Sequence, residues 1–161
     1  TYTGKGLPAK WLQNQTMEMD SFSMCAWAGW PLYASAWTED AIGDGGIATE
    51  LFNAITGSNY YYEEFTELWN PGWSISRAIQ AREGKRKEHD LEILDIPSQV
   101  EKKVAKFPDG AEGFKAGIEE YYAARGWDPE TGIPTRSTLE SEGLGYVADE
   151  LESKYGIAVK D

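Results

Sequence analysis

Only one cysteine, Cys25, and one histidine, His89, occur in the sequence. A single cysteine excludes a disulfide bond within the chain, and it is too few to hold zinc or an iron–sulfur cluster alone. A metal site at Cys25 therefore needs ligands from outside these 161 residues. His89 lies in the charged run 85–90, so we expect a solvent-exposed imidazole rather than a catalytic one.

Basic residues are scarce, because 15 Lys and Arg stand against 27 Asp and Glu and leave a formal net charge of −12. Such a surface repels phosphate, so we expect no nucleic-acid partner. No apolar run reaches the ~20 residues that span a bilayer. No signal peptide is visible either, so we expect no membrane association and a cytoplasmic location. The chain begins at Thr1 rather than Met, and we expect a processed chain or a piece of a longer polypeptide.

Apolar residues make up 41% of the chain, including seven tryptophans, which indicates a packed globular protein. Strand-like alternation is scarce, and helical spacing predominates. We therefore predict an all-α fold: one irregular domain over residues 1–161 with five to seven helices. The predicted helices are 8–19, 48–57, 61–83 (split at Pro71-Gly72), 110–125, 136–142 and 145–154. We expect a buried, broken segment over 20–37, a surface loop over 38–47, and mostly extended chain over 85–109 with a short helix near 98–105.

Inward-facing side chains follow from the same spacing. In the first predicted helix these are Trp11, Leu12, Gln15 and Met19, and in the fourth they are Phe114, Ile118, Tyr121 and Tyr122. The acidic pairs Glu63-Glu64 and Glu119-Glu120 are expected to be solvated rather than to form an acid/base pair, because adjacent helical residues face different ways.

Asp20 lies five residues before Cys25 in the most apolar part of the chain. One interpretation is a buried, inert thiol next to a helix-end carboxylate. The other is a thiolate metal ligand next to a carboxylate that accepts hydrogen bonds from a cofactor. The residues alone leave both open.

Several segments, in order over about residues 10–146, resemble the aldehyde:ferredoxin oxidoreductase family. Asp20-Ser21-Phe22-Ser23-Met24-Cys25 is similar to the family's D-S-L-x-L-C signature. The other matching segments are Asn53-Ala54-Ile55-Thr56-Gly57, Arg77-Ala78 with Arg82-Glu83-Gly84, Arg86-Lys87 with Asp90 and Pro97, Tyr121-Tyr122-Ala123-Ala124-Arg125-Gly126-Trp127-Asp128, and Gly132-Ile133-Pro134-Thr135 with Leu139 and Gly143-Leu144.

The resemblance implies the C-terminal helical part of a longer tungstopterin enzyme. The cofactors it implies are a tungsten bis-pterin and one [4Fe-4S] cluster. In this family three cluster cysteines come from an upstream segment, and the fourth corresponds to Cys25. The family's Asp that hydrogen-bonds a pterin corresponds to Asp20, and Met24 corresponds to a residue that touches the pterin through its backbone.

The implied reaction is oxidation of an aldehyde to a carboxylic acid, with electrons passing through the cluster to ferredoxin or an iron–sulfur partner subunit. Other implied partners are the upstream domains and a second copy in a homodimer. None of the residues here is expected to act as the acid or base.

The sequence departs from the family at Ser23 and Met24, at Asn70-Pro71-Gly72-Trp73, and at His89 with Glu92–Asp95. Residues 143–150 resemble the tail of the tungsten-containing benzoyl-CoA reductase branch. Reduction of an aromatic thioester is therefore a second hypothesis, and a non-catalytic helical interaction domain is a third.

Overall fold

The structure is a computed structural model that describes residues 1–29, 44–104, 106 and 108–161. Internal contacts divide the chain into two compact units. We call Thr1–Lys10 with Asn70–Asp161 the larger unit, and Trp11–Trp69 the smaller unit. The sequence predicted a single domain over residues 1–161. That single domain stays a prediction. The predictions for 30–43, which cover most of the expected broken segment and loop, lie outside the described residues.

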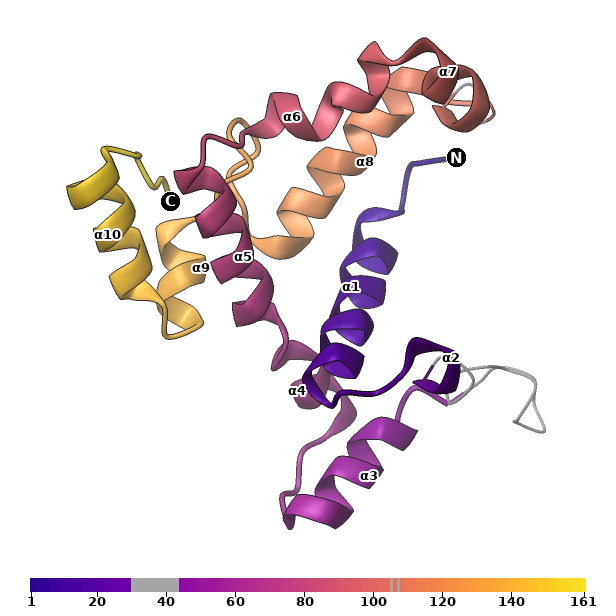
Figure 1. The fold of residues 1–161 in the computed structure, drawn as a ribbon, viewed down its shortest axis with the longest axis vertical. Helices are drawn as coiled ribbons and strands as arrows, with labels where there is room; N and C mark the ends of the chain where they lie inside the picture. Colours follow the sequence, from indigo (N-terminus) through magenta and orange to yellow (C-terminus); the bar gives the residue numbers. More distant parts are fainter. Residues whose placement is uncertain (30–43, 105, 107) are drawn as a thin grey trace. The chain divides into compact units, whose positions relative to one another are not determined.

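The described residues form helices joined by turns (Figure 1). Their only strand-like pairing is an isolated antiparallel bridge between Trp127 and Pro134, so the predicted all-α class is confirmed. No helix in the part of the chain that the structure describes is long and apolar enough to cross a membrane. The helices are α1 Gly6–Ser21, α2 Ala26–Gly29, α3 Ile47–Thr56, α4 Tyr62–Glu67, α5 Asn70–Arg82, α6 Lys87–Leu91, α7 Pro97–Gln99, α8 Gly110–Arg125, α9 Arg136–Ser141 and α10 Gly145–Tyr155.

The core of the larger unit lies where α5, α9 and α10 pack side by side, as Figure 1 shows. Its buried side chains are Ala78, Leu139, Leu144, Ala148, Leu151 and Val159. Thr135 begins α9 as predicted, because its hydroxyl accepts a hydrogen bond from the Thr138 N–H. Gly126 ends α8 with φ +67, a left-handed conformation that side chains disfavour.

A buried polar network ties α5 to α6 and α8 inside the larger unit. Arg77, only 3% exposed, pairs with Asp90 through both terminal nitrogens, at 3.2 and 2.6 Å. Its Nε donates to the Gly132 carbonyl at 2.7 Å, and the Tyr122 hydroxyl donates to Asp90 at 2.5 Å. The Arg77 guanidinium also stacks over the Trp127 ring at 5.3 Å. A buried cation is tolerated here because each of its polar groups has a partner.

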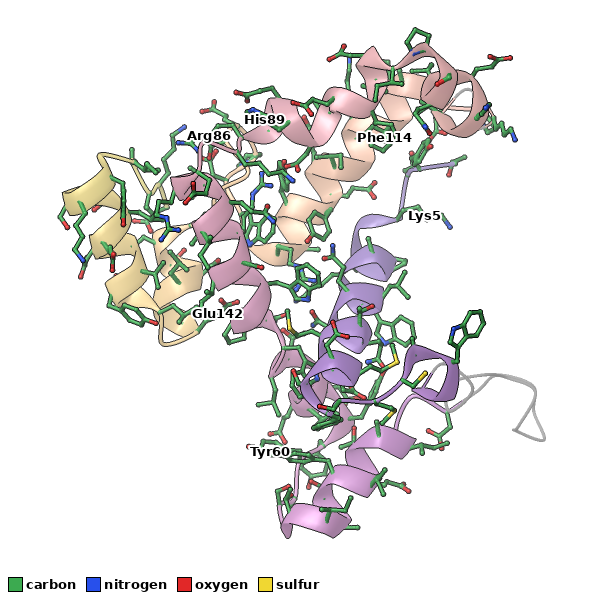
Figure 2. The ribbon with its side chains drawn as sticks, viewed as in Figure 1. Lys5, Tyr60, Arg86, His89, Phe114 and Glu142 are labelled. Atoms are coloured by element: carbon green, nitrogen blue, oxygen red, sulfur yellow. The ribbon has the colours of Figure 1, made fainter. Side chains whose placement is uncertain are left out.

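The prediction of mostly extended chain over 85–109 was wrong. This stretch contains α6, a 3₁₀ turn over Glu92–Asp95, α7 and a π-helical turn over Val100–Val104. Arg86 and His89 cap the start of α6, where Figure 2 labels both, through a 3.0 Å bond from the Arg86 N–H to His89 Nδ1. Val104 at the end of the π-helical turn is 1% exposed, whereas α6, the 3₁₀ turn and α7 have no buried residue. Because several helices are this short, the described residues hold ten α-helices rather than five to seven.

Two of the four inward-facing predictions for α1 were also wrong. Gln15 and Met19 are buried, but Trp11 and Leu12 are 38% and 48% exposed. The buried face instead carries Asn14, whose amide donates to the Thr66 carbonyl at 2.9 Å, and Glu18. Hydrophobicity misplaced the face because buried polar side chains, including Asn14 with its internal partner, occupy it. On α8, Tyr122 is buried as predicted, whereas Phe114, Ile118 and Tyr121 are half-buried.

Candidate functional site

The segment from Asp20 to Cys25 is a helix C-cap that reverses the chain at the end of α1. The Met24 N–H donates to the Met19 carbonyl at 2.8 Å, and the Ser23 N–H donates to the Asp20 carbonyl at 3.1 Å. This pair of bonds defines a Schellman motif, with Ser23 as its left-handed residue. The five-residue separation therefore has a geometric meaning. Asp20 lies in the last turn of α1, and Cys25 follows directly after the cap.

Ser23 adopts φ +53, and among the described residues it is the only non-glycine with positive φ. Glycine usually occupies this position, because an L side chain costs about 1–2 kcal/mol in the left-handed region. Such strain persists only where the surrounding structure enforces it. The strained residue lies between Asp20 and Cys25.

Phe22 anchors the cap in the aromatic core of the smaller unit. Its ring stacks on Phe52 and Phe65 at 5.6 and 6.2 Å and meets Trp69 edge-on at 5.5 Å. Phe65 is 1% exposed, and the other three rings of the cluster are half-buried around it. A pocket of about 350 Å³ adjoins Phe22 and is otherwise lined by Ala48, Leu51, Phe52, Ile55 and Thr56 of α3.

The polar ends of the cap face outward. Asp20 and Cys25 are exposed and Met24 is half-buried. The interpretation of Cys25 as a buried thiol is therefore wrong, since Phe22 is half-buried against aromatic rings and the thiol stays accessible. Among the described residues, no side-chain partner occupies the Asp20 carboxylate. Trp27, two residues beyond Cys25, is 90% exposed.

A metal cluster needs more ligands than the cap supplies. Within residues 1–29, 44–104, 106 and 108–161, no three His, Cys, Asp or Glu side chains group as metal ligands. Cys25 can provide one thiolate, and Asp20 can accept hydrogen bonds from a bound N–H group. The donor set thus fits one quarter of an iron–sulfur site beside a cofactor edge.

The other residues singled out by the sequence lie away from the cap. His89 is exposed and caps α6, as expected of a surface histidine. Glu63 and Glu64 are exposed on α4, and Glu119 pairs with Lys87 at 2.7 Å. Glu120 is not simply solvated, because its carboxylate accepts the Gly4 N–H at 2.8 Å.

Two perturbed pKa values also lie elsewhere, in the Arg77 network of the larger unit. Burial, with Asp90 as a further cause, raises the pKa of Tyr122. For Asp90, burial would raise the pKa, but hydrogen bonds from Arg77 and Tyr122 and the charge of Arg77 outweigh it and lower the pKa. Because every partner is internal, we interpret this cluster as structural.

Comparison with known families agrees with the helical fold. The family model described as aldehyde ferredoxin oxidoreductase, domains 2 & 3, matches residues 1–144. No solved structure matches the chain. The matched residues include the whole Asp20–Cys25 cap and every helix from α1 to α9. The chain therefore belongs to the aldehyde ferredoxin oxidoreductase family of oxidoreductases.

Proposed function

We propose that this chain is the C-terminal helical part of a tungsten-dependent enzyme that oxidises aldehydes to carboxylic acids. Electrons leave through a [4Fe-4S] cluster to ferredoxin or an iron–sulfur partner subunit. Cys25 is one ligand of the cluster, and Asp20 hydrogen-bonds a pterin of the tungsten cofactor. The remaining ligands come from upstream domains of the same enzyme, which works in the cytoplasm and is a candidate homodimer.

The observation that carries the proposal is the exposed pair Asp20 and Cys25 at the two ends of one helix cap. An exposed thiol can join ligands supplied by another part of a protein, whereas a buried one cannot. The exposure of Trp27 supports the same reading, because a large indole next to the thiol is suited to burial against protein or cofactor.

Met24 is assigned a narrower role than the resemblance implies. Its N–H is already committed to the Met19 carbonyl at 2.8 Å. A backbone contact from Met24 to a pterin must therefore use its carbonyl oxygen, which would accept a hydrogen bond from a pterin N–H.

The chemistry divides between the cofactors and the chain. When bound, the tungsten pterin supplies two-electron redox chemistry, and the cluster passes electrons singly. The Cys25 thiolate holds iron, the Asp20 carboxylate orients a pterin edge, and Phe22 anchors the cap through its stacking on Phe52 and Phe65. No residue of this chain is assigned to proton transfer.

A second candidate keeps the same site and reverses the redox direction, towards reduction of an aromatic thioester. It is favoured by residues 143–150, which resemble the benzoyl-CoA reductase branch and continue past the family match into α10. Turnover of benzoyl-CoA and not of simple aldehydes by the full enzyme would select it.

The test uses the full polypeptide or complex, purified without oxygen, with metal analysis and electron paramagnetic resonance (EPR). We expect tungsten and a four-iron cluster in the wild type, and loss of the four-iron signal in Cys25→Ser. Asp20→Asn removes a charge-assisted hydrogen bond worth about 1.5–3 kcal/mol, so pterin retention should fall about ten- to a hundredfold.

Glu63→Gln is the matched control, because Glu63 is an exposed carboxylate of the same unit outside the cap. If the wild-type protein contained neither tungsten nor iron, both redox hypotheses would fail, and the hypothesis of a non-catalytic helical interaction domain would remain. A Cys25→Ser protein with a complete four-iron signal would remove Cys25 from the ligand set.

A further inference from the structure

A packing contact behind the cap joins the last turn of α1 to α2. A β-carbon added at Gly29 would overlap Met19 Sδ and would lie 3.0 Å from Met19 Cγ and 3.2 Å from Met24 Sδ. Both methionine side chains therefore lie directly against the Gly29 α-carbon. Met19 is 2% exposed and Gly29 is buried, so this contact lies inside the smaller unit.

Two backbone hydrogen bonds and one side-chain packing contact hold the residues on either side of Cys25. Met24 is hydrogen-bonded to Met19 at 2.8 Å, and the Gly29 N–H donates to the Cys25 carbonyl at 2.8 Å. The packing contact is made by the thioethers of Met19 and Met24 against Gly29. We name Met19, Met24 and Gly29 the clasp.

We propose that the clasp positions Cys25 for its cluster, with Gly29 as the residue on which its geometry depends. This inference rests on the proposed function, since it assumes that Cys25 binds iron. Any side chain at Gly29 must displace the Met19 thioether or move α2. Because the Gly29 N–H is bonded to the Cys25 carbonyl, a movement of α2 displaces Cys25. Outer residues that orient a ligand typically change metal affinity by 10–100-fold when altered.

The test compares Gly29→Ala with wild type in the full anaerobic enzyme. We expect about tenfold weaker iron affinity in a chelator titration, together with a shifted cluster reduction potential and altered EPR signature. Met19→Ala removes the two atoms nearest to the new methyl group and leaves Met24 Sδ at 3.2 Å, so Gly29→Ala/Met19→Ala should move back towards the wild-type potential and signature.

Gly117→Ala is the matched control. Gly117 also lies in a helix, but a β-carbon there makes only ordinary contacts, the nearest at 3.5 Å to Tyr2. We expect it to leave iron affinity, potential and signature unchanged. The proposal would be overturned by a Gly29→Ala enzyme with wild-type iron affinity, reduction potential and EPR signature. It would also be overturned by a double variant whose potential and signature remain as altered as those of Gly29→Ala.

A cofactor-free readout separates this inference from the proposed function. In iron-free full-length protein, iodoacetamide should alkylate Cys25 at different rates in wild type and Gly29→Ala, and at equal rates in wild type and Gly117→Ala. If Gly29→Ala does not fold, Met19→Ala alone loosens the clasp without overlap and should raise the alkylation rate; an unchanged rate would overturn the inference. Wild-type protein that never binds iron would instead refute the proposed function, whatever the alkylation rates.

Discussion

Ser23 is the residue of the cap whose backbone conformation is energetically unfavourable. Its φ of +53 places a side chain where glycine is usual, directly between the proposed pterin contact and the proposed iron ligand. Cys25 and Asp20 are exposed, whereas Phe22 is half-buried and stacks on Phe52. The six residues thus include one aromatic anchor, one strained residue, one outward hydrogen-bond acceptor and one outward thiol.

Ser23→Gly should raise the free energy of unfolding by about 0.5–1 kcal/mol, since relief of left-handed strain exceeds the added unfolded-state entropy of glycine. Urea unfolding measures the change. Ser21→Gly is the control, because Ser21 is in right-handed helix and glycine there should destabilise by about 0.5–1 kcal/mol. A loss of stability in Ser23→Gly would contradict the strain argument.

At the scale of elements, the larger unit depends on the Arg77 network, which ties α5 to α6, to α8 and to the turn before α9. Asp90 is central because it accepts hydrogen bonds from Arg77 and from Tyr122. Lys85 adds a further ion pair at 3.1 Å. Removing one partner leaves a buried cation with too few acceptors, which costs far more than a surface ion pair.

Acid should destabilise the chain through Asp90. Its folded-state pKa is lowered, so the ionised form stabilises the fold above the unfolded-state pKa, and this stability is lost as pH falls through the folded value. We expect unfolding free energy to decline below about pH 4. Asp90→Asn should be less stable at neutral pH and show a shallower decline, in urea unfolding over a pH series. The exposed Glu88→Gln is the control, and an unchanged slope in Asp90→Asn would refute the assignment.

At the scale of the whole molecule, the division into two compact units predicts local responses to local changes. Asp90→Asn should speed amide hydrogen exchange around residues 77–91 and 122–133, where the network's partners lie. Exchange over residues 44–69 of the smaller unit should stay as in the wild type. Hydrogen-exchange mass spectrometry measures both. Equal acceleration in the two units would indicate one cooperative domain over 1–161, as the sequence predicted.

The sequence by itself determined the helical class, the positions of the long helices and the family. Helical spacing and terminators such as Gly57 and Gly126 are local, so α3 and α8 could be located without tertiary information. The ordered motifs pointed to Asp20, Met24 and Cys25 before any geometry was known. The short helix expected near 98–105 corresponds to α7 and the π-helical turn after it, whereas α6 and the 3₁₀ turn were missed because their residues are mostly polar.

Tertiary structure alone decided which side of each element is buried and how the site is held. The polar buried face of α1, with Asn14 and Glu18, depends on partners that spacing cannot supply. The exposure of Cys25 and the left-handed Ser23 follow from the cap, whose hydrogen bonds the sequence does not spell out. From the sequence, Gly29 was expected only to interrupt the apolar segment 20–37. Only the packing of Met19 and Met24 against its α-carbon shows that a β-carbon has no room there.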